Sequence, residues 1–430
     1  MGSEPGDRDV RRRGRLFYGW RVLAAAGLQG MFGGGTAHSG FSVFFLPIQR
    51  DLGLSYTSMS LVFSLARAEG GVSGFVLGWL VDKVGSRRLV LFGGLTAGIG
   101  MVLLSQVHAY WLLLLVYVGV VSIGRSAGMG QTLMAVVNQW FIRHKALAMS
   151  TLMTSFAMGG AIAVPLLALG IEHLGWRATL LYAGLFIGLL TLPVALIIRS
   201  KPEDLGLRPD GSLASRPASL AGWRGRRSPP DGTGDFTVRQ ALRTRAFWLL
   251  LVAIGLRVVV VDALTIHQIP MLVWKGINEQ TAAFYVSLMF FLSIPLRFGL
   301  GLAGGLFSPR KVVFAGMSIG ALGLLGMLTL EGVPAVVGLI VALAVVEGVT
   351  SVNWITVSDY FGRSRFASLM GVMSAFLNLG SATAPVLSGW AFDQTQSYNL
   401  VLATCLPLFL AGGIVFALAR PPSLPGPSPH

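Results

Sequence analysis

Nine ionisable side chains lie inside or near the ends of long apolar stretches of this sequence, where a charge is costly. A charged side chain at the centre of a bilayer costs several kcal/mol unless it faces protein or water. Residues of this kind serve as ion-pair partners, proton carriers or ligands for a charged solute. They are Arg67, Glu69, Arg125, Arg257, Asp262, Arg297 and Glu347, with His38 and His267 nearer the outer side.

The arginines predict binding of an anion. A guanidinium is a planar fork that binds a carboxylate through two hydrogen bonds, so we expect Arg297 to hold an anionic substrate. Arg257, His38 and His267 are further candidate ligands. For Arg297 the alternative is an ion pair with a neighbouring helix, and for each histidine it is a hydrogen-bonded packing position.

The carboxylates Asp262, Glu347 and Glu69 are candidate proton carriers, because a buried carboxyl group resists ionisation unless it is paired. A static ion pair is the alternative for each of them. Arg67 and Glu69 are two residues apart and point roughly 200° away from each other on a helix, so they cannot neutralise each other. Each needs a partner on a different neighbour, and we expect Arg67 and Arg125 to be buried charge partners.

The elements that carry these residues are predicted to be membrane-spanning helices. Of 430 residues 53% are hydrophobic and 12% charged, with a mean hydropathy of +0.70. A soluble domain carries roughly 25% charged residues. Lipid offers the backbone no hydrogen-bond partner, so apolar runs of about 20 residues predict spanning helices. Twelve are expected, at 22–46, 57–81, 89–107, 110–137, 147–172, 178–198, 246–273, 280–304, 312–329, 334–358, 366–391 and 397–419.

The distribution of lysine and arginine predicts the orientation. With both termini in the cytoplasm, 26 of the 33 basic residues fall in the tails, the central linker and the loops on that side. Arg50, Arg177 and Lys275 fall on the other side. Basic residues accumulate in cytoplasmic loops, so we expect a multi-pass protein of the cell membrane with both termini cytoplasmic. The net charge of +15 therefore indicates topology rather than nucleic-acid binding.

Residues 200–245 interrupt the apolar pattern. The segment is polar, basic and rich in Pro and Gly, which predicts a flexible cytoplasmic linker. The expected organisation is a cytoplasmic tail over 1–19, a six-helix half over 20–199, the linker, a second six-helix half over 246–420 and a cytoplasmic tail over 421–430.

An internal repeat relates the two halves. The segment WFIRHKALAMSTLMTSFAMGGAIAVP, which begins at Trp140, matches YFGRSRFASLMGVMSAFLNLGSATAP, which begins at Tyr360, at a constant offset of 220 residues. Two parallel six-helix repeats joined by a linker are typical of secondary transporters whose substrate site lies near the bilayer midplane, between the halves.

The loop after the second predicted helix reads GWLVDKVGSRR, and with it the sequence resembles the major facilitator superfamily. That superfamily carries Gly, Asp, Gly and paired basic residues here. The resemblance implies that the loop contacts helix 11 and holds the inner gate closed; a solvated turn is the alternative. The second half has only a degraded copy, RFGLGLAGGLFSPRK, without the Asp. The implied gating residues are Gly78, Asp82, Lys83, Gly85, Arg87 and Arg88.

Within the superfamily the chain resembles the bacterial branch of the monocarboxylate porter and oxalate–formate antiporter group, in stretches such as FYGWRVL, ARAEGG, PEDLGLRPDG and GWAFDQTQSY. Arg297 matches an Arg of helix 8 in these relatives. The Asp that eukaryotic porters place one turn earlier is Ser293 here, and their helix 1 Lys and the antiporters' helix 11 Lys have no match. The resemblance also implies that helices 1, 4, 7 and 10 line a central cavity, to which Arg125, Arg257, Asp262 and Glu347 would belong.

These patterns predict a secondary transporter that carries a small organic anion, expected to be a monocarboxylate, by alternating access with proton symport or exchange. We expect one pairing of Arg67 or Glu69 to break and re-form as the halves move. Efflux of drugs or metabolites is the alternative function. A non-transporting membrane sensor is a third, which would need an output domain that the linker is too short to form.

No enzyme, cofactor or metal site is predicted. Both G-x-S-x-G matches lie inside apolar helices, no P-loop is present, and the single cysteine, Cys405, lies in the last helix. The predicted partners are the substrate anion, protons and the lipid bilayer, with a monomer as the functional unit.

Overall fold

The structure, a computed structural model, describes residues 17–142, 144–207, 236–362 and 366–422. The side chains of several further residues, His38 and Asp82 among them, and the burial of Gly78 lie outside this description. Within the described ranges the chain is helical and has no strand, as expected where backbone groups must bond within their own segment.

The described chain before residue 208 is built from helical elements. They are α1 (Tyr18–Leu28), the π-helix η2 (Gln29–Ser39), the 3-10 helix η3 (Gly40–Phe44), α2 (Phe45–Asp51), α3 (Tyr56–Val84), α4 (Ser86–Leu104), α5 (Tyr110–Val116), the π-helix η4 (Tyr117–Ser122), α6 (Ile123–Met129), α7 (Gln131–Trp140), α8 (Lys145–Ile197) and the 3-10 helix η5 (Pro202–Leu205).

The elements after residue 235 complete the chain. They are α9 (Val238–Leu242), α10 (Arg245–Thr265), α11 (Gln268–Trp274), α12 (Glu279–Leu306), α13 (Pro309–Thr329), α14 (Gly332–Phe361), α15 (Phe366–Ser381), α16 (Ala384–Thr395) and α17 (Asn399–Leu418).

Every predicted span lies on helical elements, although some spans are divided. Nine helical stretches of the described chain are long and apolar enough to cross a membrane. One of them, Leu147–Ile197, is broken at Gly175, whose φ of 80° and ψ of 162° are not helical. The first two predicted spans correspond to the run from α1 to α2 and to α3, which is 29 residues long and carries Arg67 and Glu69.

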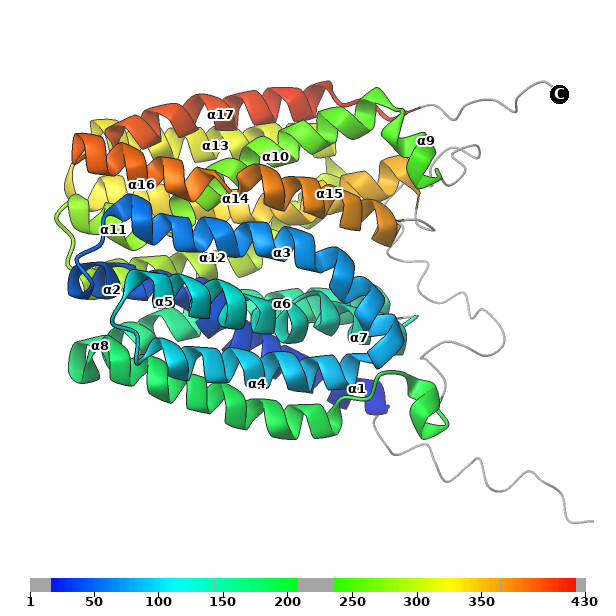
Figure 1. Cartoon of the computed structure of the whole chain (residues 1–430). Coiled ribbons are helices and arrows are strands. Elements are labelled where there is room, and N and C mark those ends of the chain that lie inside the picture. The colour runs from blue at the N-terminus through cyan, green and yellow to red at the C-terminus, as the bar shows by residue number, and fades with distance from the viewer. Residues whose placement is uncertain (1–16, 143, 208–235, 363–365, 423–430) are drawn as a thin grey trace, which may run out of the picture.

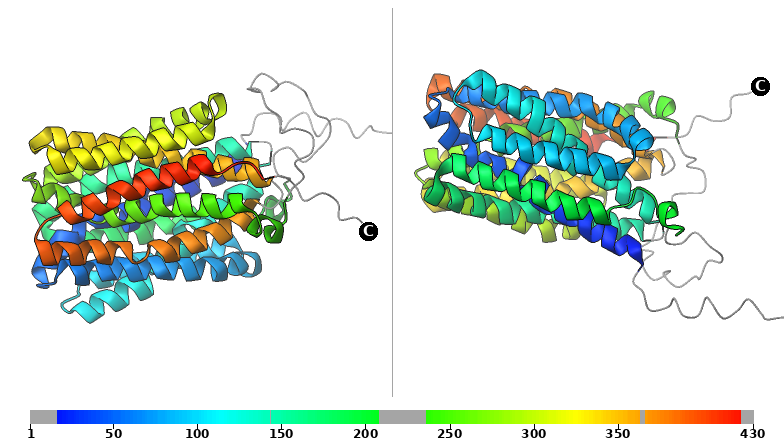
Figure 2. Two further views of the ribbon diagram at one scale, coloured as in Figure 1. Left: turned by 90° about the horizontal axis from the view of Figure 1, so that it is seen from above. Right: turned by 60° about the horizontal axis from the view of Figure 1, so that its bottom comes forward.

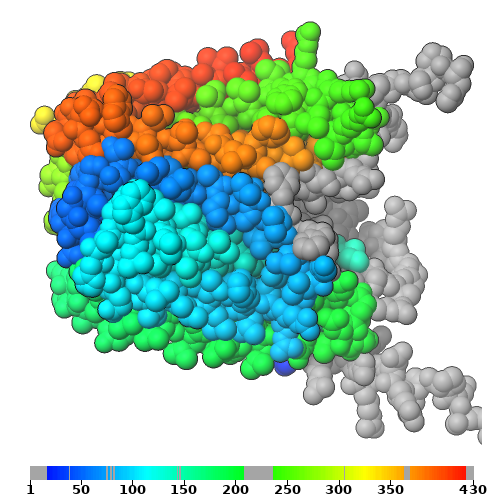
Figure 3. All heavy atoms as spheres, in the orientation of Figure 1, coloured from blue at the N-terminus to red at the C-terminus, as the bar shows by residue number. Residues whose placement is uncertain are grey.

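The helices form two bundles that lie side by side (Figures 1 and 2). In the first bundle α4 packs on α6 and α8, and α8 packs on η2; in the second, α13 packs on α14 and α17, and α12 on α14. Glycines bring the helices of the first bundle close, because a Cβ at Gly93 would lie 2.2 Å from the Gly128 nitrogen. The bundles meet through α3 against α15 and α16, and through α8 against α12; Figure 3 shows α3 and α16 in contact at the surface.

The internal repeat is visible as a repeated hydrogen bond. Trp140 Nε1 donates to the Arg199 carbonyl at 2.9 Å, and Tyr360 OH donates to the Ala419 carbonyl at 2.9 Å. Both pairs follow the sequence offset of 220 residues. In the first bundle the bond joins the end of α7 to the chain just after α8, and in the second it joins the end of α14 to the chain just after α17.

The start of α1, the ends of α3 and α17, and α9 lie at one end of the molecule, which we call the linker end (Figure 1). The opposite end, with the turn before α3 and the turn between α16 and α17, is called the far end. Short helices η5 and α9 occupy both edges of the predicted linker, and its residues 208–235 lie outside the described chain.

Candidate functional site

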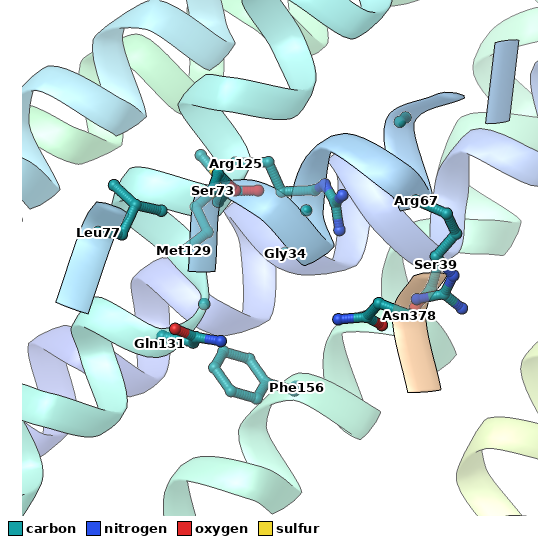
Figure 4. Close-up of a pocket in the computed structure, with 14 residues that line it drawn as sticks. Gly34, Ser39, Arg67, Ser73, Leu77, Arg125, Met129, Gln131, Phe156 and Asn378 are labelled. Atoms are coloured by element: carbon teal, nitrogen blue, oxygen red, sulfur yellow. The ribbon is translucent and has the colours of Figure 1, made fainter. Parts of the chain in front are cut away.

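A cavity of about 270 Å³ is lined mainly by the first bundle and reaches the second bundle at one residue, Asn378. It begins near the middle of α3 and continues toward the linker end, past Leu77 and the start of α7 (Figure 4). Its lining consists of Gly34, Ser39, Ala66, Arg67, Gly70, Ser73, Leu77, Arg125, Ser126, Met129, Gly130, Gln131, Phe156 and Asn378.

Two guanidinium groups give the cavity its charge. Arg67 comes from α3 and Arg125 from α6, and no carboxylate is among the described residues that line the cavity. The second bundle contributes Asn378 from α15, which lies next to Arg67 in Figure 4. Two cations with amide and hydroxyl groups around them are suited to an anion with hydrogen-bonding oxygens.

Arg67 also forms an ion pair across the two bundles. Its Nη2 donates to Oδ1 of Asp262 on α10. The side chain of Asp262 is 2% exposed and that of Arg67 is 28% exposed, so the pair lies at the inner wall of the cavity. The second carboxylate oxygen of Asp262, Oδ2, is buried and has no hydrogen-bond partner among the described residues.

Glu69 turns away from Arg67, into its own bundle. Its Oε2 accepts hydrogen bonds from the hydroxyls of Ser122 on η4 and Ser126 on α6, the latter at 3.5 Å. Arg125 donates to the same Ser122 hydroxyl, at 3.5 Å. Arg67 and Glu69, which point to opposite sides of α3, thus find partners on different bundles, and the partner of Arg67 across the seam is on α10.

Arg297 and Glu347 pair with each other inside the second bundle. Arg297 Nη2 of α12 donates to Glu347 Oε2 of α14 at 2.9 Å, and their side chains are 25% and 21% exposed. Neither lines the described cavity. Arg257 of α10 is buried and donates a long hydrogen bond, 3.5 Å, to the Val346 carbonyl.

His267 lies in a closed seam at the far end. Its ring is fully buried, with Nε2 3.0 Å from the Ser60 hydroxyl of α3 and Nδ1 3.0 Å from the Tyr398 hydroxyl. Nearby, Asp393 of α16 accepts hydrogen bonds from the backbone nitrogens of Tyr56 and Thr57, at 3.0 and 2.8 Å, and so caps the start of α3. Both ring nitrogens of His267 thus have partners in the seam, and His267 is not among the described residues that line the cavity.

The loop expected to form the inner gate is described only in part. Gly85 has a φ of 88° and so permits the tight turn between α3 and α4. Arg87 donates from Nε to the Ala195 carbonyl at 2.8 Å, within the first bundle, whereas Lys83 and Arg88 are exposed. The burial of Gly78, the side chains of Asp82 and of the candidate ligand His38, and residues 363–365 lie outside the description.

The sequence pattern did not identify Asn378, Gln131 and Phe156 as cavity residues. Asn378 and Gln131 carry a signal, because each is an amide within a predicted apolar span, where a polar group needs a partner or a ligand. Arg67 and Arg125, expected only as charge partners, line the cavity, whereas Arg297, the expected ligand, does not.

The comparison with known families agrees with this architecture. A model of the Major Facilitator Superfamily matches residues 23–272 and 263–430, which is nearly the whole chain. The chain belongs to this superfamily. Its fold and family are those of membrane transporters and not of enzymes.

Similar proteins include transporters named for monocarboxylates. The chain is 26% identical to monocarboxylate transporter 2 of Mesocricetus auratus over 92% of the chain and 83% of the relative. It is 22% identical to the MFS-type transporter YcxA of Bacillus subtilis, over 85% of the chain and 86% of the relative. Among solved structures, a bacterial homologue of the lysosomal transporter Spinster, inward-facing and occupied, superposes with a TM-score of 0.70 at 16% identity, covering 94% of this chain and 96% of that one.

Proposed function

We propose that this transporter carries a small organic anion, a monocarboxylate, by alternating access coupled to protons as symport or exchange. The observation that carries the proposal is the cavity lined by Arg67 and Arg125 with no carboxylate among its described lining residues. Such a lining attracts an anion and disfavours the cationic amphiphiles of a drug efflux pump.

Arg125 is the proposed primary ligand of the carboxylate, and Asn378 and Gln131 are proposed hydrogen-bond donors. Arg67 is a second cation on the cavity wall, already engaged by Asp262. Because one of the two cations is already paired with a protein carboxylate, the lining suits a substrate with one carboxylate better than a dicarboxylate. The names of the relatives, monocarboxylate transporters 2, 6 and 12, support the same class.

The remaining charged pairs take other places in the proposal. Asp262, Glu347 and Glu69 stay candidate proton carriers, because each is a partly or fully buried carboxylate. Asp262 and Glu347 pair with arginines, and Glu69 accepts hydrogen bonds from serine hydroxyls. Arg297 becomes a substrate ligand only if its pairing with Glu347 opens. We assign the linker end to the cytoplasm of a cell membrane, on the distribution of basic residues, and a monomer as the functional unit.

A binding experiment tests the substrate class. Bound ligand stabilises the folded state, so thermal unfolding of the purified protein is measured with acetate, lactate, pyruvate, succinate and a cationic amphiphile. A monocarboxylate is expected to raise the unfolding temperature, and the Arg125→Gln variant is expected to lose the shift. The Thr404→Ala variant, altered on the exposed face of α17, is the control and should keep it. Stabilisation by the amphiphile alone would overturn the proposal in favour of efflux.

A further inference from the structure

The ion pair between Arg67 and Asp262 joins the two bundles at the cavity wall. Arg67 is the eleventh residue after the start of α3, roughly 16 Å along the helix axis, so it lies near the middle of the span. Its guanidinium both lines the cavity and donates to Asp262 across the seam. A substrate carboxylate in this cavity would therefore meet a cation that a protein carboxylate already holds.

Arg67 is the cation that hydrogen-bonds to Asp262. Its side chain is 2% exposed, Oδ1 accepts from Arg67, and Oδ2 is buried without a hydrogen-bond partner among the described residues. A buried carboxylate that loses its partner is strongly disfavoured as an anion and takes up a proton instead. A proton is thus the natural replacement when Arg67 turns to another anion.

Among the described residues, no other charged group hydrogen-bonds to Asp262 in place of Arg67. Arg257, five residues earlier on α10, attracts Glu347 and Asp262 electrostatically. Its hydrogen bond goes to the Val346 carbonyl. Arg297 of α12 and Glu347 of α14 pair with each other. Of the elements packed on α10, α16 carries Asp393, which caps α3, and α17 carries buried Cys405. His267 at the far end is bonded to Ser60 and Tyr398.

We propose that Asp262 stands in for the substrate carboxylate on Arg67 while the cavity is empty. When the substrate binds, its carboxylate accepts the hydrogen bonds of Arg67, and Asp262 takes one proton from water and becomes a neutral carboxyl group. On release the proton leaves and the ion pair re-forms, so one anion and one proton move together. This inference rests on the proposed function and assigns the coupling step within it to one residue pair.

The Asp262→Asn variant separates coupling from binding. Asn is neutral in both states, so the variant is expected to keep exchange of labelled for unlabelled lactate across proteoliposomes while losing about tenfold or more of the uptake driven by an inward proton gradient. In the unaltered protein lactate affinity should rise by up to about tenfold per pH unit as the pH falls, and in Asp262→Asn it should stay flat. Asp51→Asn, which removes an exposed carboxylate paired with Arg177 inside the first bundle, is the control and should behave as the unaltered protein.

A double variant guards against a folding defect. The double variant Arg67→Gln with Asp262→Asn removes both charges of the pair, so neither is left unpaired. Its unfolding temperature is the measurement that tells whether the protein is intact. It should bind lactate more weakly than Asp262→Asn and with no pH dependence. An unchanged pH dependence in either variant would overturn the inference and leave the proposed function standing. Lack of any carboxylate exchange by the unaltered protein would overturn the proposed function, and this inference with it.

Discussion

At the scale of single residues, the second bundle contributes Asn378 to a cavity whose two cations belong to the first. Removing its amide should weaken substrate binding without stopping the transport cycle, since one hydrogen bond to a charged group contributes about 1.5 kcal/mol. We expect Asn378→Ala to raise the KM of lactate transport by about tenfold with little change in maximal rate. Thr404→Ala, whose hydroxyl bonds only within α17, serves as the control. An unchanged KM would exclude Asn378 as a ligand.

The pairing of Arg297 with Glu347 is a second prediction at this scale. Arg297→Gln leaves Glu347 without its cation and should lower the free energy of unfolding by about 1–3 kcal/mol, because both groups are only partly exposed. Combining it with Glu347→Gln should restore most of that loss, as seen by thermal unfolding in detergent. If the double variant is as unstable as the single one, the two side chains do not stabilise the protein as a pair.

At the scale of elements, α3 packs against α16 through Gly389 at the far end. A Cβ on Gly389 would lie 2.6 Å from the Tyr56 carbonyl oxygen, so even Gly389→Ala must push α3 outward. We expect this variant to open the far-end seam and to raise the thiol labelling rate of a Ser64→Cys reporter, which is buried on α3, several-fold. Gly371→Ala is the matched control, because a Cβ there has open space around it. Equal labelling in both variants would contradict a seam held closed by this contact.

The sequence predicted where the helices lie better than which side of each helix faces the cavity or the other bundle. Every predicted span lies on helical elements, and nine stretches of the described chain are long and apolar enough to cross a membrane. The break at Gly175 falls between two of the predicted spans. Periodicity also separated Arg67 from Glu69, but the partner of Arg67 is 195 residues away and depends on how the bundles rotate against each other. The same dependence hides the cavity, because whether Arg125 or Arg297 faces it follows from helix packing and not from residue type. A lone Asn such as Asn378 looks the same in sequence whether it lines a cavity or packs.

At the scale of the whole molecule, the two bundles are joined at the far end by the seam of His267 and Asp393, and the cavity extends toward the linker end. We expect the linker end to face the cytoplasm. In intact cells a membrane-impermeant thiol reagent should label Glu331→Cys, exposed in the turn between α13 and α14, and not Glu203→Cys, exposed on η5. Lysed cells should label both, and the reverse pattern in intact cells would invert the assigned orientation.

The central claim is that this superfamily member moves a small carboxylate through a cavity whose cations bind it. Its most direct test is the uptake of labelled lactate or pyruvate into proteoliposomes preloaded with the unlabelled acid, with the unaltered protein and with Arg125→Gln. We expect saturable exchange by the unaltered protein and at least about a tenfold loss in Arg125→Gln, with Thr404→Ala unaffected. Exchange by Arg125→Gln at the rate of the unaltered protein would contradict this claim.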